Sequence, residues 1–175
     1  MAHEDGEIYW YDPDPRTIIP LEQFHISRSL ARTIQKNKFN VTINKAFSAV
    51  IHACSLPANG REETWISSEI ITAYTELHRL EFAHSIECWH AGKLVGGLYG
   101  VAINGFFAGE SMFTHSRDAS KVALVHLVAH LHGAAFQLLD VQFMTEHLRR
   151  FGAVEIPRNV YQIKLARALE VPTRF

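Results

Sequence analysis

Residues 84–113 read HSIECWHAGKLVGGLYGVAINGFFAGESMF, and this stretch decides the fold. It contains three mainly apolar runs, which are separated by the pairs Ala91-Gly92 and Asn104-Gly105. Glycine and asparagine are the residues that tight hairpin turns require. The pattern therefore predicts three strands joined by two hairpins, and they span residues 84–90, 93–103 and 106–113.

Strand and helix patterns alternate after this meander. An apolar helix is expected to begin after Asp118 as its N-cap, and short apolar runs follow it. The expected elements are helix 119–132, strand 137–143, helix 146–151, strand 153–156 and helix 158–169. An antiparallel meander followed by strand–helix–strand units predicts an α/β fold with a mixed sheet flanked by helices, in an order similar to that of acetyltransferase-like (GNAT) folds.

The part of the chain that precedes the meander is less regular. Ile70, Ile71, Tyr74 and Leu77 form a helical stripe, and Ser27 is expected to cap the first helix. The expected elements are turn 12–15, helix 27–37, strand 39–44, helix 46–55, loop 56–62 and helix 67–80. Because the loop carries Pro57 and Asn59-Gly60, we expect the boundary there: residues 1–62 form an N-terminal segment with a basic helix, and residues 63–175 a GNAT-like catalytic domain.

Composition indicates a globular chain of ordinary size. The 175 residues are 47% hydrophobic and 20% charged, with a net charge of −1, so any contact with RNA must come from a local basic patch. The two cysteines form no CxxC pair, the first seven residues lack the apolar core of a secretion signal, and glycines interrupt the longest apolar stretch, residues 94–108. We expect a soluble, cytoplasmic protein.

Isolated carboxylates stand in two apolar strands. Asp140 and Gln142 lie two residues apart in the run 138–143, so a strand would direct both to one face. A buried carboxylate is costly without a partner, and Asp140 could equally cap a loop or pair with an arginine. Glu110 interrupts the apolar strand 106–113. Taken alone, this position is as compatible with a structural ion pair as with a functional site. Two such strands together favour a shared polar site.

Glycines and basic residues add two further patterns. Gly96, Gly97 and Gly100 in one strand indicate either a close backbone approach, such as a substrate's, or a bulge. Arg28, Arg32 and Lys36 are spaced four residues apart, so they lie on one face of a helix, and Lys38 extends this stripe. The stripe is either a solvated helix face or a surface that contacts phosphates. Arg149, Arg150 and Arg158 form a candidate second patch.

A metal site receives little support. His126 and His130 are four residues apart on the helix 119–132, but Leu127 stands where a zinc-peptidase helix needs glutamate. We therefore expect no metal.

Many short motifs occur in an order that resembles one family. They are Tyr11-Asp12-Pro13-Asp14-Pro15-Arg16, His25-Ile26-Ser27-Arg28-Ser29, Thr64-Trp65-Ile66, His84-Ser85-Ile86-Glu87, Leu94–Val101, Gly109-Glu110-Ser111-Met112-Phe113, Ala119-Ser120-Lys121, Leu139-Asp140-Val141-Gln142, Gly152-Ala153 and Glu155-Ile156-Pro157-Arg158. From about Ile8 to Pro172 the chain is similar to the bacterial leucyl/phenylalanyl-tRNA–protein transferases.

The resemblance implies an aminoacyltransferase with a GNAT-like catalytic domain. Such an enzyme moves leucine or phenylalanine from aminoacyl-tRNA to the N-terminal α-amine of acceptor proteins, with a preference for those that begin with Arg or Lys, and so marks them for degradation under the N-end rule. No cofactor is implied. The turn 114–120 agrees, because it lacks the glycines with which acetyl-CoA enzymes bind pyrophosphate.

The resemblance also assigns residues. Asp140, Gln142 and Glu110 are implied to be catalytic: Gln142 orients the amine or donates to the oxyanion, Asp140 fixes Gln142 or accepts charge from the amine, and Glu110 completes an acidic pocket. Arg28, Arg32, Lys36 and Lys38 are expected to bind tRNA. The implied aminoacyl pocket consists of apolar and aromatic residues, which by pattern alone would be core: Trp65, Tyr74, Leu98, Phe107, Met112, Leu127, Leu131 and Leu139.

The chain departs from the family pattern at its start. Family members carry an additional N-terminal domain, and almost nothing precedes Tyr9-Trp10-Tyr11 here, so the resemblance is to a short form. Val141 replaces the usual cysteine between Asp140 and Gln142. Two alternatives stay open: an acyltransferase that uses a different donor, and a non-catalytic module that binds tRNA or peptide.

Overall fold

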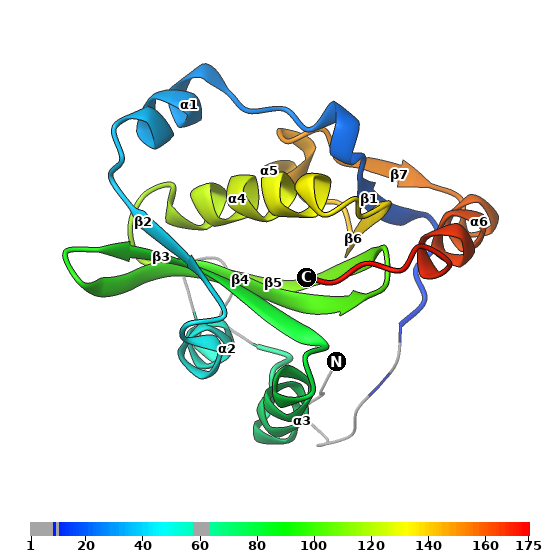
Figure 1. Ribbon diagram of the computed structural model, residues 1–175, viewed down its shortest axis with the longest axis horizontal. Coiled ribbons are helices and arrows are strands. Elements are labelled where there is room, and N and C mark those ends of the chain that lie inside the picture. The colour runs from blue at the N-terminus through cyan, green and yellow to red at the C-terminus, as the bar shows by residue number, and fades with distance from the viewer. Residues whose placement is uncertain (1–8, 10, 58–63) are drawn as a thin grey trace.

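The computed structural model describes residue 9, residues 11–57 and residues 64–175. These residues form a seven-stranded sheet in the order β2-β3-β4-β5-β6-β1-β7 (Figure 1). The strands are β1 (Arg16–Ile19), β2 (Asn40–Ile43), β3 (Ala83–His90), β4 (Lys93–Ile103), β5 (Phe106–Thr114), β6 (Leu138–Gln142) and β7 (Val154–Ile156). Every neighbouring pair in this sheet is antiparallel except β5 and β6, which are parallel.

Helices cover both faces of the sheet (Figure 1). They are α1 (Arg28–Gln35), α2 (Phe47–Ser55), α3 (Ser68–Arg79), α4 (Ala119–Gly133), α5 (Glu146–Arg149) and α6 (Arg158–Leu169), with a 3-10 turn at Leu21–Gln23. Helix α4 connects β5 to β6 and packs on β3, β4 and β5, while α2 and α3 lie on the opposite face. Within the described residues, no helix is both long and apolar enough to cross a membrane.

The two hairpins form where the sequence predicts them. Ala91, Gly92 and Asn104 have positive φ angles of 49°, 74° and 51°, which tight reversals between strands require. The predicted strands and helices from residue 27 onward are all present, with ends that differ by at most two residues. The mixed sheet flanked by helices is therefore confirmed.

Strand β1 was not predicted, because its four residues follow a proline-rich turn and show no clear alternation. It lies between β6 and β7 and is antiparallel to both. Since β2 pairs with β3 in the same sheet, the segment 1–62 contributes two strands to the sheet of the C-terminal part. The expected boundary at residues 62 and 63, like most of the expected loop 56–62, lies outside the described residues, and the division stays a prediction.

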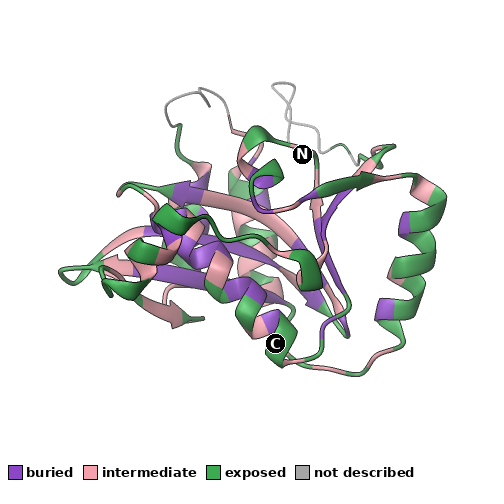
Figure 2. Ribbon diagram, turned by 90° about the horizontal axis from the view of Figure 1, so that it is seen from above, coloured by how far each residue is buried: buried purple, intermediate pink, exposed green. Residues whose placement is uncertain are grey.

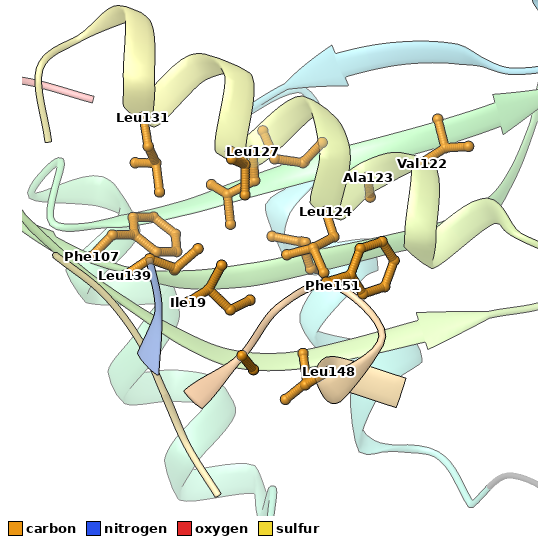
Figure 3. Packing of buried hydrophobic residues seen from close by; sticks show 14 of the residues in the cluster. Ile19, Phe107, Val122, Ala123, Leu124, Leu127, Leu131, Leu139, Leu148 and Phe151 are labelled. Atoms are coloured by element: carbon orange, nitrogen blue, oxygen red, sulfur yellow. The ribbon is translucent and has the colours of Figure 1, made fainter. Parts of the chain in front are cut away.

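The largest core cluster lies between α4 and the sheet. Leu124, Leu127 and Leu131 point from α4 toward Phe107 and Leu139 of the strands (Figure 3). Buried residues concentrate in the central strands and in α4, while the outer helices are largely exposed (Figure 2). This layer positions the floor of the site described below.

The glycines of β4 are explained by packing within the protein. A Cβ atom on Gly96 would lie 2.5 Å from the Cβ of Ala119, so this glycine lets α4 begin against the strand. A Cβ on Gly97 would lie 2.7 Å from the carbonyl oxygen of Ile86. A Cβ on Gly100 would lie 2.2 Å from the carbonyl oxygen of Ala108, at a register shift between β4 and β5. The structure thus favours close packing and a bulge over a substrate's approach at these three positions.

The expected cap at Asp118 is wrong in its mechanism. Asp118 occupies the N-cap position of α4 but has a φ of 70°, and its side chain makes no capping hydrogen bond. Its carboxylate pairs instead with the ammonium of Lys121 at 2.7 Å. Ser27 does cap α1, because its hydroxyl accepts the backbone N–H of Leu30 at 3.3 Å.

A third buried carboxylate, Glu87 on β3, joins β2 to the start of α2. The hydroxyls of Thr42 and Ser85 donate to it, and so do the backbone N–H groups of Lys45 and Ala46. Helix α2 has Ala46 at its N-cap and so lacks a side-chain cap of its own. Glu87 therefore satisfies backbone donors at the beginning of α2, which is a structural role.

Candidate active site

Strands β5 and β6 part from each other, and a cavity lies at this opening. They pair only from Phe106 and Leu138 to Ala108 and Asp140, whereas β5 continues to Thr114. Beyond that point, residues 109–112 of β5 and residues 141–142 of β6 line a cavity of about 490 Å³. We call it the sheet cavity. Its volume lies within the range of about 300–1,000 Å³ that is common for small-molecule sites.

The floor of the sheet cavity is apolar. Leu98 and Met112 come from β4 and β5, and Leu124 and Leu127 come from α4. Six of the eight predicted pocket residues line it: Trp65, Tyr74, Leu98, Met112, Leu127 and Leu139. The cavity can therefore hold a branched or aromatic hydrocarbon side chain beneath its polar mouth.

Phe107 and Leu131, the other two predicted pocket residues, do not line the cavity. Both are 0% exposed and lie in the core cluster between α4 and the sheet (Figure 3). Leu124 and Leu148 take part in the lining although they were not predicted. Leu124 was detectable, because it lies three residues before Leu127 and hence on the same helical face.

Glu110 supplies a carboxylate to the wall of the sheet cavity. Burial raises the pKa of this carboxyl to about 7, the hydrogen bond from the Tyr74 hydroxyl lowers it, and the charge of Asp140 raises it further. Burial also raises the pKa of the Tyr74 hydroxyl, with a further rise from the charge of Glu110. At neutral pH Glu110 is therefore balanced between its acid and its base form.

Asp140 lies behind the wall and outside the lining of the cavity. The Arg16 guanidinium donates to its carboxylate twice, from Nε to Oδ1 at 3.1 Å and from Nη2 to Oδ2 at 2.6 Å. The Tyr161 hydroxyl donates to Oδ2 at 2.8 Å, and the backbone N–H of Gln142 donates to Oδ1 at 2.9 Å. Asp140 is 0% exposed. The arginine pairing that its sequence pattern allowed is thus observed.

Gln142 lines the sheet cavity, and Asp140 holds its backbone rather than its side chain. Gln142 has a φ of 59°, and it stands where the register between β1 and β6 shifts. Strand alternation therefore ends at this residue, and Asp140 and Gln142 do not share a face in the way that the i, i+2 spacing predicted. The hydrogen bond to Asp140 instead fixes the turn that directs the Gln142 side chain.

Arg16 lines the cavity and was not recognised as a site residue. Its guanidinium lies 4.9 Å from the centre of the Tyr161 ring and 3.8 Å from the Asp12 carboxylate. Asp12 also pairs with Arg158 at 2.9 Å, and the backbone N–H of Arg158 donates to Asp14. In the sequence, Arg16 is recognisable only as the arginine that follows an Asp-Pro-Asp-Pro turn. The motif does not indicate that its partner is Asp140, which lies 124 residues away.

The predicted basic stripe is exposed. Arg28 and Arg32 lie on α1, and Lys36 and Lys38 lie in the turn that follows it. The Lys38 ammonium donates to the Ser116 hydroxyl at 3.3 Å, which places the end of the stripe beside the start of α4. Arg158, by contrast, is engaged with Asp12 and Asp14, so the second patch suggested by the sequence does not include it.

The described residues contain no group of three or more His, Cys, Asp or Glu side chains that could hold a metal ion. His126 and His130 both lie on α4, and burial lowers the pKa of each. The polar groups of the sheet cavity include the Gln142 amide, the Glu110 carboxyl, the Arg16 guanidinium and the His147 imidazole, which can orient an ester and an amine and can accept a proton.

Comparison with solved structures concerns the fold. The structure of L-PGS from Bacillus licheniformis matches this chain with a TM-score of 0.50 at 14% identity, covering 78% of this chain and 50% of that one. Together with the observed sheet, this likeness confirms the predicted GNAT-like fold class.

Comparison with protein families and curated proteins concerns the sequence. The family model described as leucyl/phenylalanyl-tRNA protein transferase matches residues 18–166. A protein of that name from Phenylobacterium zucineum is 56% identical over 174 residues, which cover 99% of this chain and 79% of the relative. Its namesake from Herpetosiphon aurantiacus is 56% identical over 173 residues, covering 98% and 88%. The chain therefore belongs to the leucyl/phenylalanyl-tRNA protein transferase family.

Proposed function

We propose that this protein transfers a leucyl or phenylalanyl group from aminoacyl-tRNA to the N-terminal α-amine of an acceptor protein in the cytoplasm. The observation that carries the proposal is the sheet cavity: an apolar floor lies below a mouth that presents Glu110, Gln142 and Arg16. The family membership supports the same reaction. The transferred residue would mark the acceptor for degradation.

The donor side chain would occupy the apolar floor. Leucine and phenylalanine both fit a slot formed by Leu98, Leu127 and the flexible Met112. Smaller side chains would be rejected through lost contact, worth about 1–3 kcal/mol per methylene. The ester would then lie where β5 and β6 part, within reach of the Gln142 amide. This amide is suited to donate to the oxyanion that forms at the ester carbonyl.

The acceptor amine would attack the ester carbon from the polar side. A new C–N bond forms, the bond to the ribose oxygen of the tRNA breaks, and that oxygen leaves with a proton. The proton that the attacking nitrogen loses would pass to Glu110, whose pKa of about 7 lies close to the value of about 7.7–8.0 of an α-amine, and Glu110 would then give this proton to the leaving ribose oxygen. Similar pKa values make such a transfer efficient. Asp140 would act as a positioning residue through Arg16 and Gln142.

The charges at the mouth favour acceptors that begin with Arg or Lys. Asp12 and Asp14 stand near the mouth with Asp140 and Glu110, and Arg16 and Arg158 are the two cations that pair with this group. The three aspartates therefore outnumber the two cations there, and Glu110 adds a fourth negative charge when it is ionised. A cationic first side chain would relieve this imbalance, whereas an acidic one would increase it.

The RNA of the donor would contact the exposed stripe of Arg28, Arg32, Lys36 and Lys38. Four cations on one surface supply a local positive field that the net charge of −1 conceals. We propose no acetyl-CoA as donor, because the turn 114–120 lacks the glycines of a pyrophosphate loop. This surface and the sheet cavity together suit a donor that combines RNA with an apolar acyl group.

A transfer assay tests the proposal. Purified protein is mixed with labelled Leu-tRNA or Phe-tRNA and a peptide that begins with arginine. Label should enter this peptide and should stay out of the same peptide with an acetylated N-terminus. A peptide that begins with glutamate should accept less label. Folded protein that binds the tRNA but transfers neither amino acid would contradict the proposal and would favour a binding module.

A further inference from the structure

A second cavity lies beside the basic stripe and is separate from the proposed chemistry. It measures about 530 Å³ and is bounded by the start of α1, the turn before α4, and α5. Its polar lining consists of Ser27, Ser29, Arg117, Lys121, His147 and Arg150, together with two carboxylates, Asp118 and Glu146. We call it the basic cleft.

The carboxylates of the basic cleft do not cancel its positive charge. Asp118 pairs with Lys121 at 2.7 Å and lies 3.7 Å from Arg117, and Glu146 lies 3.5 Å from Arg150, so three cations face two carboxylates. The Arg150 and Glu146 side chains are 75% and 69% exposed, and exposed pairs of this kind contribute only about 0–1 kcal/mol. A group with more negative charge than one carboxylate, such as a phosphate, can therefore recruit Arg150 at little cost, and it can compete with Asp118 for Lys121 and Arg117.

The basic cleft continues the surface that would contact RNA. Arg28, the first residue of the stripe, stands between Ser27 and Ser29, which both line the cleft. At the other end, Lys38 donates to the hydroxyl of Ser116, next to Arg117. Serine hydroxyls and Lys or Arg side chains are the groups that most often contact nucleic-acid phosphates.

His147 joins the basic cleft to the sheet cavity, because it lines both. Its Nε2 atom is buried and has no hydrogen-bond partner within the described residues. An RNA molecule that places its acyl group in the sheet cavity would thus pass His147, whose other side lines the basic cleft with Lys121 and Arg150.

We propose that the basic cleft binds a backbone phosphate of the donor tRNA, through Lys121 with Arg117, Arg150 and the hydroxyl of Ser29. This inference rests on the proposed function, since it takes the donor to be an aminoacyl-tRNA. It joins Arg150, from the second patch that the sequence suggested, to Lys121, Arg117 and Ser29, which the sequence did not assign to RNA and which lie outside the exposed stripe.

The test measures tRNA binding as a function of salt, together with transfer. Lys121→Gln should weaken the binding of tRNA about tenfold, as expected for one lost charge-assisted contact. It should also reduce the slope of log affinity against log salt by about 1. Transfer from an aminoacyl-adenosine, which has no phosphate, should be unchanged. The matched control is Lys164→Gln on the exposed side of α6, which should change none of these values.

Arg117→Gln and Ser29→Ala repeat the test at side chains that are exposed, in case Lys121→Gln lowers the folded fraction. The inference is overturned if all three variants keep the wild-type salt slope. It is also overturned if they reduce transfer from aminoacyl-adenosine and transfer from aminoacyl-tRNA equally. A further contradictory result would be variants that lose affinity for an acidic peptide and keep the wild-type affinity for tRNA. Because binding of uncharged tRNA needs no turnover, an inactive wild-type protein would contradict the proposed function and still leave this test decisive.

Discussion

Asp140 illustrates how a single residue can matter for a site that it does not line. Its carboxylate receives the Arg16 guanidinium, the Tyr161 hydroxyl and the Gln142 backbone N–H. Removing its charge would leave a guanidinium that is only 14% exposed without its main partner. Asp140 therefore fixes the positions of two residues that do line the sheet cavity.

Asp140→Asn should lower the free energy of unfolding by about 3–5 kcal/mol, because it breaks a buried ion pair. It should also lower the transfer rate at saturating donor about a hundredfold, through misplacement of Arg16 and Gln142. Urea unfolding and single-turnover transfer measure the two effects. Tyr161→Phe is the control, since it removes one hydrogen bond from the same carboxylate and keeps the ion pair. Equal losses of stability in the two variants would contradict this role.

Glu110 should give the transfer reaction a pH dependence of its own. The carboxyl is protonated below its pKa of about 7 and ionised above it, so a proton-accepting role is absent at low pH and present at high pH. The ratio of wild-type rate to Glu110→Gln rate should rise between about pH 6 and 8. The titration of the peptide amine is common to both proteins and cancels in this ratio. A ratio that does not vary with pH would argue against proton transfer to Glu110.

Tyr74→Phe extends the same measurement. The Tyr74 hydrogen bond lowers the pKa of Glu110, so its removal should raise that pKa and move the rise in rate to higher pH. A shift to lower pH would contradict the assigned hydrogen bond.

At the scale of elements, the contact between β4 and the start of α4 sets the depth of the sheet cavity. Helix α4 provides Leu124 and Leu127 to the floor, and β4 provides Leu98. Gly96 allows the two elements to approach, since a Cβ atom there would lie 2.5 Å from the Cβ of Ala119 and 3.0 Å from its carbonyl carbon. The backbone atom cannot move independently of the helix.

Gly96→Ala should therefore destabilise the protein by about 1–3 kcal/mol, the usual cost of overpacking. Gly133→Ala, at the other end of α4, is the matched control: nothing lies within 4 Å of the added methyl, and alanine should stabilise the helix by about 0.5–1 kcal/mol. Thermal unfolding of both variants gives the comparison. Stabilisation by Gly96→Ala would show that α4 does not press on β4 at this residue.

At the scale of the whole molecule, charge is segregated although the net charge is −1. The basic stripe and the basic cleft lie together around α1 and the start of α4. Asp12 and Asp14 lie instead in the ion-pair group around Arg16 and Arg158. The molecule thus separates a cationic surface from a group of carboxylates.

The double variant Arg28→Gln/Arg32→Gln should weaken tRNA binding and reduce the salt slope by about 2, one unit for each lost phosphate contact. Because neither residue lines the sheet cavity, transfer from aminoacyl-adenosine should not change. Fluorescence anisotropy with labelled tRNA across a salt series gives the slope. Replacement of Arg79 and Lys164 by glutamine on α3 and α6 controls for the loss of two charges. An equal effect of both double variants would indicate a general charge effect.

Local patterns in the sequence were sufficient for much of the fold. Turn residues at 91–92 and 104–105 defined the hairpins, and helical spacing placed α4 and its Leu127. Contacts between distant segments were not readable: β1 is short, and Arg16 meets Asp140 across 124 residues. Phe107 and Leu131 show a further limit, since an apolar residue that lines a cavity and one just behind it have the same periodicity. Glu110 and Gln142 were identified because polar residues in apolar strands are uncommon.

The most direct test of the account identifies the bond that the protein makes. An acceptor peptide that begins with arginine and contains an internal lysine is incubated with Leu-tRNA, and its product is sequenced by fragmentation mass spectrometry. We expect one added leucyl residue, attached to the α-amine of the first arginine. Leucine on the lysine side chain, or an unchanged peptide although tRNA is bound, would contradict it.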